Sequence, residues 1–200
     1  MRILGLTGSI GMGKTTAATM LRRLGVPVHD ADATVHRLLA RNGKAVAVVE
    51  AAFPGVVKNK AVDRVELGRR VFGDLAALRR LEAIIHPLVR QAEHDFIKAQ
   101  QRRRTPLVVL DIPLLFETHG EIRCDRVAVV SCPAFLQAQR VLARPGMTPE
   151  RLAAILAKQT PDGEKRRRAD YVIPTGLGKV PALRRLKAIV KAMMKDRINA

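Results

Sequence analysis

The 200-residue chain is poor in aromatic residues and has no long apolar run, and each shortage excludes a class of protein. Tryptophan is absent and aromatic residues make up 3% of the chain, which argues against the base-stacking surfaces of single-strand nucleic-acid binders. The longest apolar run, residues 107–116, is too short to span a bilayer and contains Asp111. We therefore expect no membrane partner.

Cysteine is also scarce. Cys124 and Cys132 are too few for a disulfide framework or a zinc site. The apolar run at the N-terminus is too brief for a signal peptide, and no small-residue cleavage site follows it. We expect reduced thiols and a cytoplasmic location.

Basic residues, in contrast, are in large excess. The chain has 36 Lys and Arg against 18 Asp and Glu, a net charge of +18, which attracts polyanions. The excess is spread along the chain, and its two clusters, residues 102–104 and 165–168, each end an expected helix, where cations offset the helix dipole. We favour solvated basic faces over a nucleic-acid partner.

Five short apolar runs predict buried strands, at residues 2–6, 26–29, 107–111, 126–131 and 171–173. Continuous apolarity is typical of parallel strands that are covered on both faces. Helical patterns separate the runs, at residues 14–24, from the N-cap Thr148 onward, and at residues 180–198. This alternation predicts a three-layer α/β fold with right-handed crossovers.

The connection between the second and third predicted strands is unusually long and carries helix signals without clear strands. Asp63 and Asp74 are candidate N-caps, and Pro54-Gly55 and Gly73 are breaks. His86-Pro87 marks the start of a further helix. We expect one domain over residues 1–200, with a core of about 1–35 and 105–200 and a helical insertion of about 36–104, which is a good place for substrate recognition.

The sharpest motif is GSIGMGKT at residues 8–15, which fits G-x-x-x-x-G-K-[ST] between a predicted strand and a predicted helix. Such a loop turns its backbone N–H groups, and the positive end of the next helix, toward phosphate oxygens. Lys14 would reach the β- and γ-phosphates, and the Thr15 hydroxyl would ligate Mg²⁺. The expected ATP-binding residues are Gly8, Gly11, Met12, Gly13, Lys14, Thr15 and Thr16. The alternative is a structural glycine-rich turn.

Carboxylates follow two of the predicted strands, where ligands bind in parallel sheets. Asp30 and Asp32 follow the second strand, and Asp111 ends the third. Asp32 is our candidate for accepting the proton of an attacking hydroxyl, whereas Asp30 could be only a helix N-cap. Asp111 resembles the acidic residue of a Walker B strand that supports Mg²⁺, or it could simply bond backbone groups at the strand end.

Arg140 and Arg144 are four residues apart, so on a helix they would share one face. Both could reach a transferring phosphoryl group, or both could be solvated. The following Pro145-Gly146 suggests a mobile lid, of about residues 137–160. Together these residues describe transfer of a phosphoryl group from a nucleoside triphosphate to a hydroxyl, without naming the acceptor.

At this point the sequence resembles the dephospho-coenzyme A kinases over nearly its whole length. The resemblance rests on Gly5-Leu6-Thr7-Gly8, Asp30-Ala31-Asp32, Asp63-Arg64, His86-Pro87, the run Asp111-Ile112-Pro113-Leu114-Leu115-Phe116-Glu117, Gln137, Arg140, Arg144, Gln159 and Ala169-Asp170-Tyr171-Val172-Ile173. It implies a P-loop NTPase fold with a five-stranded parallel sheet, a helical substrate-binding insertion and a lid.

The resemblance also implies the reaction: phosphorylation by Mg·ATP of the ribose 3′-hydroxyl of dephospho-coenzyme A, the last step of coenzyme A synthesis. Asp32 matches the family's catalytic carboxylate, Arg140 a lid arginine and Arg144 an ATP contact. Acceptor binding falls to Asp30, Arg64, His86, Pro113 and Leu114. ATP and dephospho-coenzyme A are the expected partners, and we favour a monomer.

Two positions depart from the family's usual pattern, and two other functions stay open. Ser9 stands where the family often has Gly, and Thr175 stands near the position of a usual Asn, which would alter a loop bond or an adenine contact. The alternatives are a P-loop kinase of another small-molecule hydroxyl, or a nucleic-acid-binding protein switched by ATP.

Overall fold

The computed structural model describes residues 1–195, and the chain folds into two units. The core unit consists of Met1–His29 and Gln100–Ala200, and the inserted unit of Asp30–Ala99. No helix in the described part of the chain is both long enough and apolar enough to cross a membrane. Cys124 and Cys132 are free cysteines.

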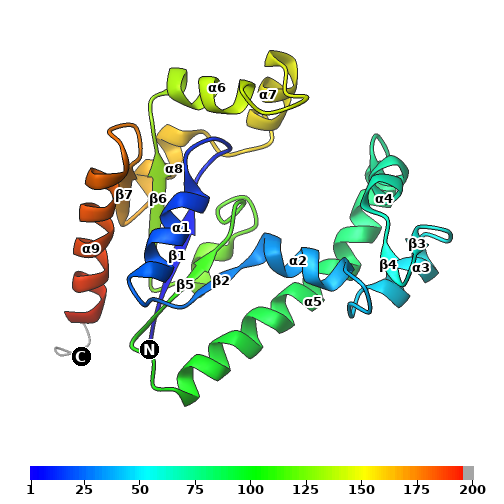
Figure 1. The fold of residues 1–200 in the computed structure, drawn as a ribbon, viewed down its shortest axis with the longest axis horizontal. Coiled ribbons are helices and arrows are strands. Elements are labelled where there is room, and N and C mark those ends of the chain that lie inside the picture. The colour runs from blue at the N-terminus through cyan, green and yellow to red at the C-terminus, as the bar shows by residue number, and fades with distance from the viewer. Residues whose placement is uncertain (196–200) are drawn as a thin grey trace. The chain divides into compact units, whose positions relative to one another are not determined.

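The predicted strands form one five-stranded parallel sheet, in the order β2-β5-β1-β6-β7 (Figure 1). The strands are β1 (Arg2–Thr7), β2 (Val28–Asp30), β5 (Leu107–Asp111), β6 (Arg126–Ser131) and β7 (Tyr171–Pro174). In the register, Leu6 of β1 lies beside Asp111 of β5. The sequence prediction of a three-layer α/β fold with this sheet is confirmed.

The core unit contains the helices α1 (Lys14–Arg23), α6 (Ala134–Leu142), α7 (Pro149–Leu156), α8 (Asp162–Arg168) and α9 (Lys179–Lys195), with a 3-10 helix η1 (Gly120–Arg123). Helices α1 and α9 pack apolar stripes against the sheet. Leu21 of α1 and Leu186 of α9 are fully buried in one cluster with Leu4 and Leu6 of β1. Full burial of each such side chain stabilises the fold by about 2 kcal/mol. The predicted helix 180–198 agrees with α9 up to Lys195, and residues 196–198 lie outside the described part.

The inserted unit is mainly helical. It contains α2 (Ala31–Leu39), α3 (Val46–Ala52), α4 (Arg64–Val71) and most of α5 (Leu75–Arg102), around an apolar cluster that includes Val49, Val56 and Leu67. Between α3 and α4 lies an antiparallel hairpin, β3 (Val57–Lys58) and β4 (Ala61–Val62). The expectation of no strands here was wrong, because two-residue strands show no alternation and the turn residues Asn59 and Lys60 (φ 51° and 64°) form no Asn-Gly signal.

Helix α5 corrects a second expectation. His86-Pro87 lies inside this 28-residue helix rather than at its start. The helix begins eleven residues before His86, at Leu75, where Asp74 Oδ1 accepts hydrogen bonds from the N–H groups of Ala76 and Ala77. The apolar stripe runs past Pro87 on both sides, from Leu81 to Val89, and its packing outweighs the hydrogen bond that proline cannot donate. Asp63 and Asp74 are helix caps, as predicted.

Candidate functional site

The loop between β1 and α1 has the backbone that a phosphate-binding loop needs. Gly11 and Gly13 adopt φ values of +76° and +91°, which only glycine adopts at low cost. A Cβ at Gly11 would also lie 2.6 Å from Val141 Cγ2. Helix α1 then begins at Lys14, and the side chains of Thr15 and Thr16 in its first turn are exposed. Phosphate oxygens can therefore reach the positive end of α1.

Lys14 is held in place by Asp111. Its Nζ lies 2.6 Å from Asp111 Oδ1, with 15% of the lysine side chain and 3% of the aspartate side chain exposed. Asp111 ends β5, the strand that pairs with β1, so the ammonium lies at the carboxyl edge of the sheet, where ligands bind in this class of fold. Sequence analysis proposed both residues, and the structure brings them together.

Two glutamines fasten the phosphate loop at Ile10. Gln137 Nε2 of α6 donates to the carbonyl of Ile10 at 2.8 Å, and the Ile10 N–H donates to Gln159 Oε1 at 3.1 Å. Gln137 is buried. The backbone carbonyl and N–H of Ile10 are thus both fixed, one by a residue of α6 and the other by a residue after α7.

Arg140, the expected lid arginine, lies against this loop. Its Nη2 donates to the Thr175 carbonyl at 2.8 Å, and its Nη1 lies 3.4 Å from Thr175 Oγ1 and 3.5 Å from the Gly11 carbonyl. The prediction that Arg140 and Arg144 share one helix face was wrong, because α6 ends at Leu142, before Arg144. Pro145 follows Arg144 and disfavours helical backbone at the residue before it.

The loop after β5 carries the two expected acceptor contacts, Pro113 and Leu114. The Pro113 carbonyl accepts a hydrogen bond from Thr7 Oγ1 at 3.0 Å, which ties this loop to the end of β1. The side chain of Leu114 is exposed. This loop therefore starts at the same edge of the sheet as the phosphate loop.

Farther along the same loop, Glu117 forms an ion pair that sequence analysis missed. Lys165 is fully buried, and its Nζ lies 2.8 Å from Glu117 Oε1. Burial alone would raise the pKa of Glu117, but the Lys165 ammonium and the N–H of Thr160 outweigh burial and lower that pKa. Lys165 was assigned to a solvated basic cluster. That was wrong for Lys165 but right for its neighbours Arg166 and Arg167, which are exposed.

In the inserted unit, Asp30 and Asp32 differ in their roles. Asp30 caps α2, because its Oδ1 accepts a hydrogen bond from the Ala33 N–H at 2.9 Å. Asp32 lies in the first turn of α2, and its side chain is exposed. His36 follows one turn later on the same helix face, and its Nδ1 lies 3.0 Å from Arg64 Nη1.

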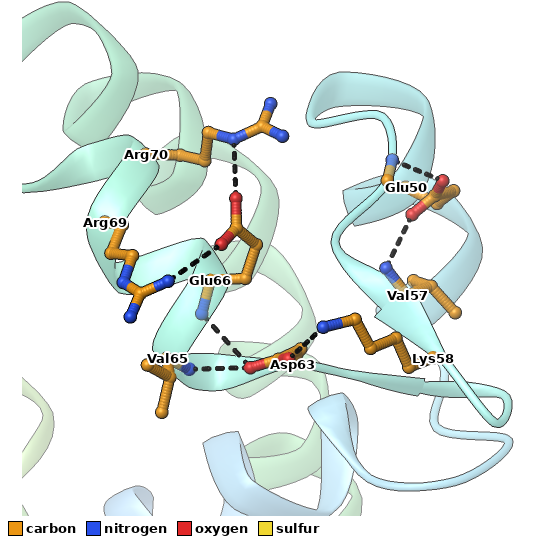
Figure 2. A network of polar contacts seen from close by, with 9 residues as sticks. Glu50, Val57, Lys58, Asp63, Val65, Glu66, Arg69 and Arg70 are labelled. Carbon is orange, nitrogen blue, oxygen red and sulfur yellow. Dashed lines mark hydrogen bonds and ion pairs between the residues drawn. The ribbon is translucent and has the colours of Figure 1, made fainter.

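Arg64 begins α4, and a polar network fixes the start of that helix (Figure 2). Asp63 Oδ1 accepts hydrogen bonds from the N–H groups of Val65 and Glu66, and Asp63 Oδ2 accepts one from Lys58 Nζ at 2.9 Å. The contact with Lys58 lowers the pKa of Asp63 and raises that of Lys58. His86, the other residue expected to bind the acceptor, is exposed on α5.

The donor atoms suit magnesium better than a transition metal. Within residues 1–195 no three His, Cys, Asp or Glu side chains gather where they could hold a metal ion. The oxygen atoms of Thr15 and Asp111 are hard ligands, and Mg²⁺ in such sites is bound by one or two side chains, with phosphates and water completing its coordination. The residues present therefore fit a magnesium ion that arrives with a nucleotide.

Comparisons with known proteins agree with this geometry. A family model described as dephospho-CoA kinase matches residues 2–177. A dephospho-CoA kinase of Paramagnetospirillum magneticum is 77% identical over 98% of this chain and 93% of its own length. A solved structure from Thermus thermophilus is 40% identical, with a TM-score of 0.81, and the match covers 96% of this chain and 97% of that one.

A more distant solved structure supports the fold alone. It is a dephospho-CoA kinase from Campylobacter jejuni, 24% identical, with a TM-score of 0.68 and coverage of 97% of this chain and 98% of that chain. The family model and the curated relative each span well over half of the chain. The chain belongs to the dephospho-CoA kinase family.

Proposed function

We propose that this chain transfers the γ-phosphoryl group of ATP to the ribose 3′-hydroxyl of dephospho-coenzyme A, the last step of coenzyme A synthesis. The observation that carries the proposal is the ion pair of 2.6 Å between Lys14 and Asp111. It holds an ammonium beside a phosphate loop, in a chain of the dephospho-CoA kinase family.

The donor site is built by the core unit. N–H groups of the loop from Gly8 to Thr16 bind the phosphates, and Lys14 contacts the β- and γ-phosphates. Arg140 offsets the negative charge that develops on the transferring group, with Arg144 as a second ATP contact. When bound, Mg²⁺ neutralises phosphate charge, and Thr15 and Asp111 are the residues that would hold it.

The acceptor site draws mainly on the inserted unit. Asp32 accepts the proton of the 3′-hydroxyl while a bond forms between that oxygen and the γ-phosphorus. The bond from the γ-phosphorus to the oxygen bridging it to the β-phosphorus breaks, and ADP leaves with that oxygen. Asp30, Arg64, His86, Pro113 and Leu114 bind the acceptor, with Arg64 suited to its phosphates.

The remaining expectations belong to this proposal. The inserted unit, Asp30–Ala99, is the acceptor-binding insertion, and residues of about 137–160 form the lid. We propose a monomer. We also propose that it works in the cytoplasm, since cysteine thiols without a disulfide require no oxidising compartment.

The test is a direct assay of the purified chain with ATP, MgCl₂ and dephospho-coenzyme A, with the product identified by mass spectrometry. We expect coenzyme A and ADP in equal amounts, and no transfer when EDTA is added. A panel of nucleosides and shikimate should give negligible product. Folded protein that yields no coenzyme A above the enzyme-free control, or that prefers another alcohol, would overturn the proposal.

A further inference from the structure

Thr175, the first residue after β7, joins three segments of the core unit. Its N–H donates to the Ser131 carbonyl at the end of β6, at 2.9 Å. Its hydroxyl donates to the Met12 carbonyl in the phosphate loop, at 2.7 Å, with the Ser131 carbonyl a longer alternative at 3.3 Å. Its own carbonyl accepts the hydrogen bond from Arg140 Nη2.

The hydroxyl of Thr175 acts in two directions at once. It has one proton, which goes to Met12 at the shorter distance, and its lone pairs face Arg140 Nη1 at 3.4 Å. The arginine fork therefore has both of its terminal nitrogens on one residue. A guanidinium bound at two points has a fixed orientation as well as a fixed position.

Met12 is anchored at its other end too. Its side chain is 2% exposed, and its sulfur lies 3.2 Å from the N–H of Cys132. The Met12 carbonyl and the Gly13 N–H belong to one planar trans peptide, so they point in opposite directions. Binding the carbonyl to Thr175 thus turns the Gly13 N–H away from Thr175. Gly13 lies beside Thr175, since a Cβ at Gly13 would be in ordinary van der Waals contact with Thr175 Cβ, at 3.4 Å.

We propose that Thr175 is a positioning residue for the donor site: it orients the Met12–Gly13 peptide so that its N–H faces the nucleotide phosphates, and it aims Arg140 at the group being transferred. This proposal rests on the proposed function for its kinetic part. Its binding part concerns ATP alone, so the two can fail separately.

The test replaces Thr175 by valine, which keeps the shape and removes the hydroxyl. Loss of one hydrogen bond to the loop should weaken ATP binding, measured by calorimetry, about two- to tenfold. The KM for ATP should rise by a similar factor and kcat should fall, with the KM for dephospho-coenzyme A unchanged. Thr175→Ser, which restores the hydroxyl, should bind ATP and turn over like the unaltered chain.

Two further variants separate positioning from a merely structural role. Thr105→Val removes a hydroxyl that donates to Gln100 Oε1 at 2.8 Å, before the amino end of β5, and should leave ATP affinity and kcat unchanged. In an Arg140→Lys background, Thr175→Val should lower kcat by a much smaller factor, because the two residues act as one unit.

Three results would overturn the proposal. One is unchanged ATP affinity in folded Thr175→Val, judged by its melting temperature. Another is equal weakening in Thr175→Ser. The last is a full, multiplicative loss of kcat in the Arg140→Lys background. If the unaltered chain made no coenzyme A, the proposed function would fail, and the calorimetry would still decide whether Thr175 orients the loop.

Discussion

The Asp111 carboxylate holds the Lys14 ammonium, and both side chains are largely buried. Asp111→Asn would leave that ammonium without its counter-charge, which costs a protein about 3–5 kcal/mol when the pair is buried. We expect a lower melting temperature, and a kcat/KM for ATP that falls by about 10- to 100-fold because Lys14 loses its position. Thermal unfolding and steady-state kinetics measure the two effects.

The control for this variant is Asp125→Asn. Asp125 also pairs with a cation, Arg2, at 3.2 Å, but each side chain of this pair is about one third exposed. Asp125 lies just before the first residue of β6. Exposed pairs contribute little to stability, so its kcat/KM for ATP should stay unchanged. Equal losses in the two variants would contradict a specific role for Asp111.

Asp32 carries the proposed proton transfer, and its replacement separates chemistry from nucleotide binding. In Asp32→Asn the amide cannot accept the proton, so kcat should fall by about 10²- to 10⁴-fold. In the proposed mechanism the phosphates are bound by the phosphate loop and Lys14 rather than by Asp32, so the affinity for ATP, measured by calorimetry, should not change. Near-normal turnover would remove Asp32 from the mechanism.

At the residue scale, local sequence signals predicted the candidate site residues, whereas contacts between residues far apart in the sequence were not predicted. Lys14 was identified because the phosphate-loop motif lies within eight consecutive residues, and Asp111 because it ends an apolar strand. Gln159 contacts Ile10 across 149 positions of sequence, and Lys165 reaches Glu117 from another element. Only the fold brings such pairs together. The buried Lys165 also lay in a basic run whose other members are exposed.

Among the elements, helix α4 ties structure to acceptor binding through its cap. Asp63→Ala removes the acceptor of two N–H groups and the partner of Lys58. Because Arg64 is the first residue of that helix, we expect both a lower unfolding midpoint in urea and a KM for dephospho-coenzyme A raised about threefold or more.

Asp74→Ala is the matched control for the cap of α4. Asp74 also accepts hydrogen bonds from two N–H groups, but the helix that it caps, α5, begins with Leu75, Ala76 and Ala77. Its loss should lower the urea midpoint without raising the KM for the acceptor. A raised KM in both variants would mean that general loosening of the inserted unit, rather than the position of Arg64, controls acceptor binding.

Prediction at the element scale worked where a local rule decides. The caps Asp63 and Asp74 and the strand Leu107–Asp111 were found, since side-chain chemistry and continuous apolarity set them. The hairpin at Val57–Val62 and the passage of α5 through Pro87 were missed. There, packing in the cluster around Val56 and Leu67 outweighs weak or contrary local signals.

The ion pair between Glu117 and Lys165 links the loop after β5 to α8. Protonation of the Glu117 carboxylate should therefore lower the stability of the fold at low pH. The pKa of Glu117 is lowered in the folded chain. The carboxylate therefore stabilises the fold above its unfolded pKa, and this contribution is lost as the pH falls through the lowered folded pKa. Glu117→Gln should lower the melting temperature at pH 7 and flatten its fall below about pH 4.5. Parallel melting curves of the two chains would contradict this assignment.

The whole molecule carries a net charge of +18, and like charges in a compact chain repel one another. Added salt screens this repulsion, because the Debye length falls from about 10 Å at 0.1 M to about 3 Å at 1 M. We therefore expect the melting temperature to rise with NaCl from about 0.05 M to about 0.5 M.

The control is the double variant Arg166→Glu, Arg167→Glu, at two exposed positions of α8. Its melting temperature should rise less steeply with NaCl. Chloride and sulfate should be compared at equal ionic strength, since sulfate also binds phosphate loops. A melting temperature that is flat or falls with NaCl would show that local pairs such as Arg168 with Glu121, and not the overall charge, set the response to salt.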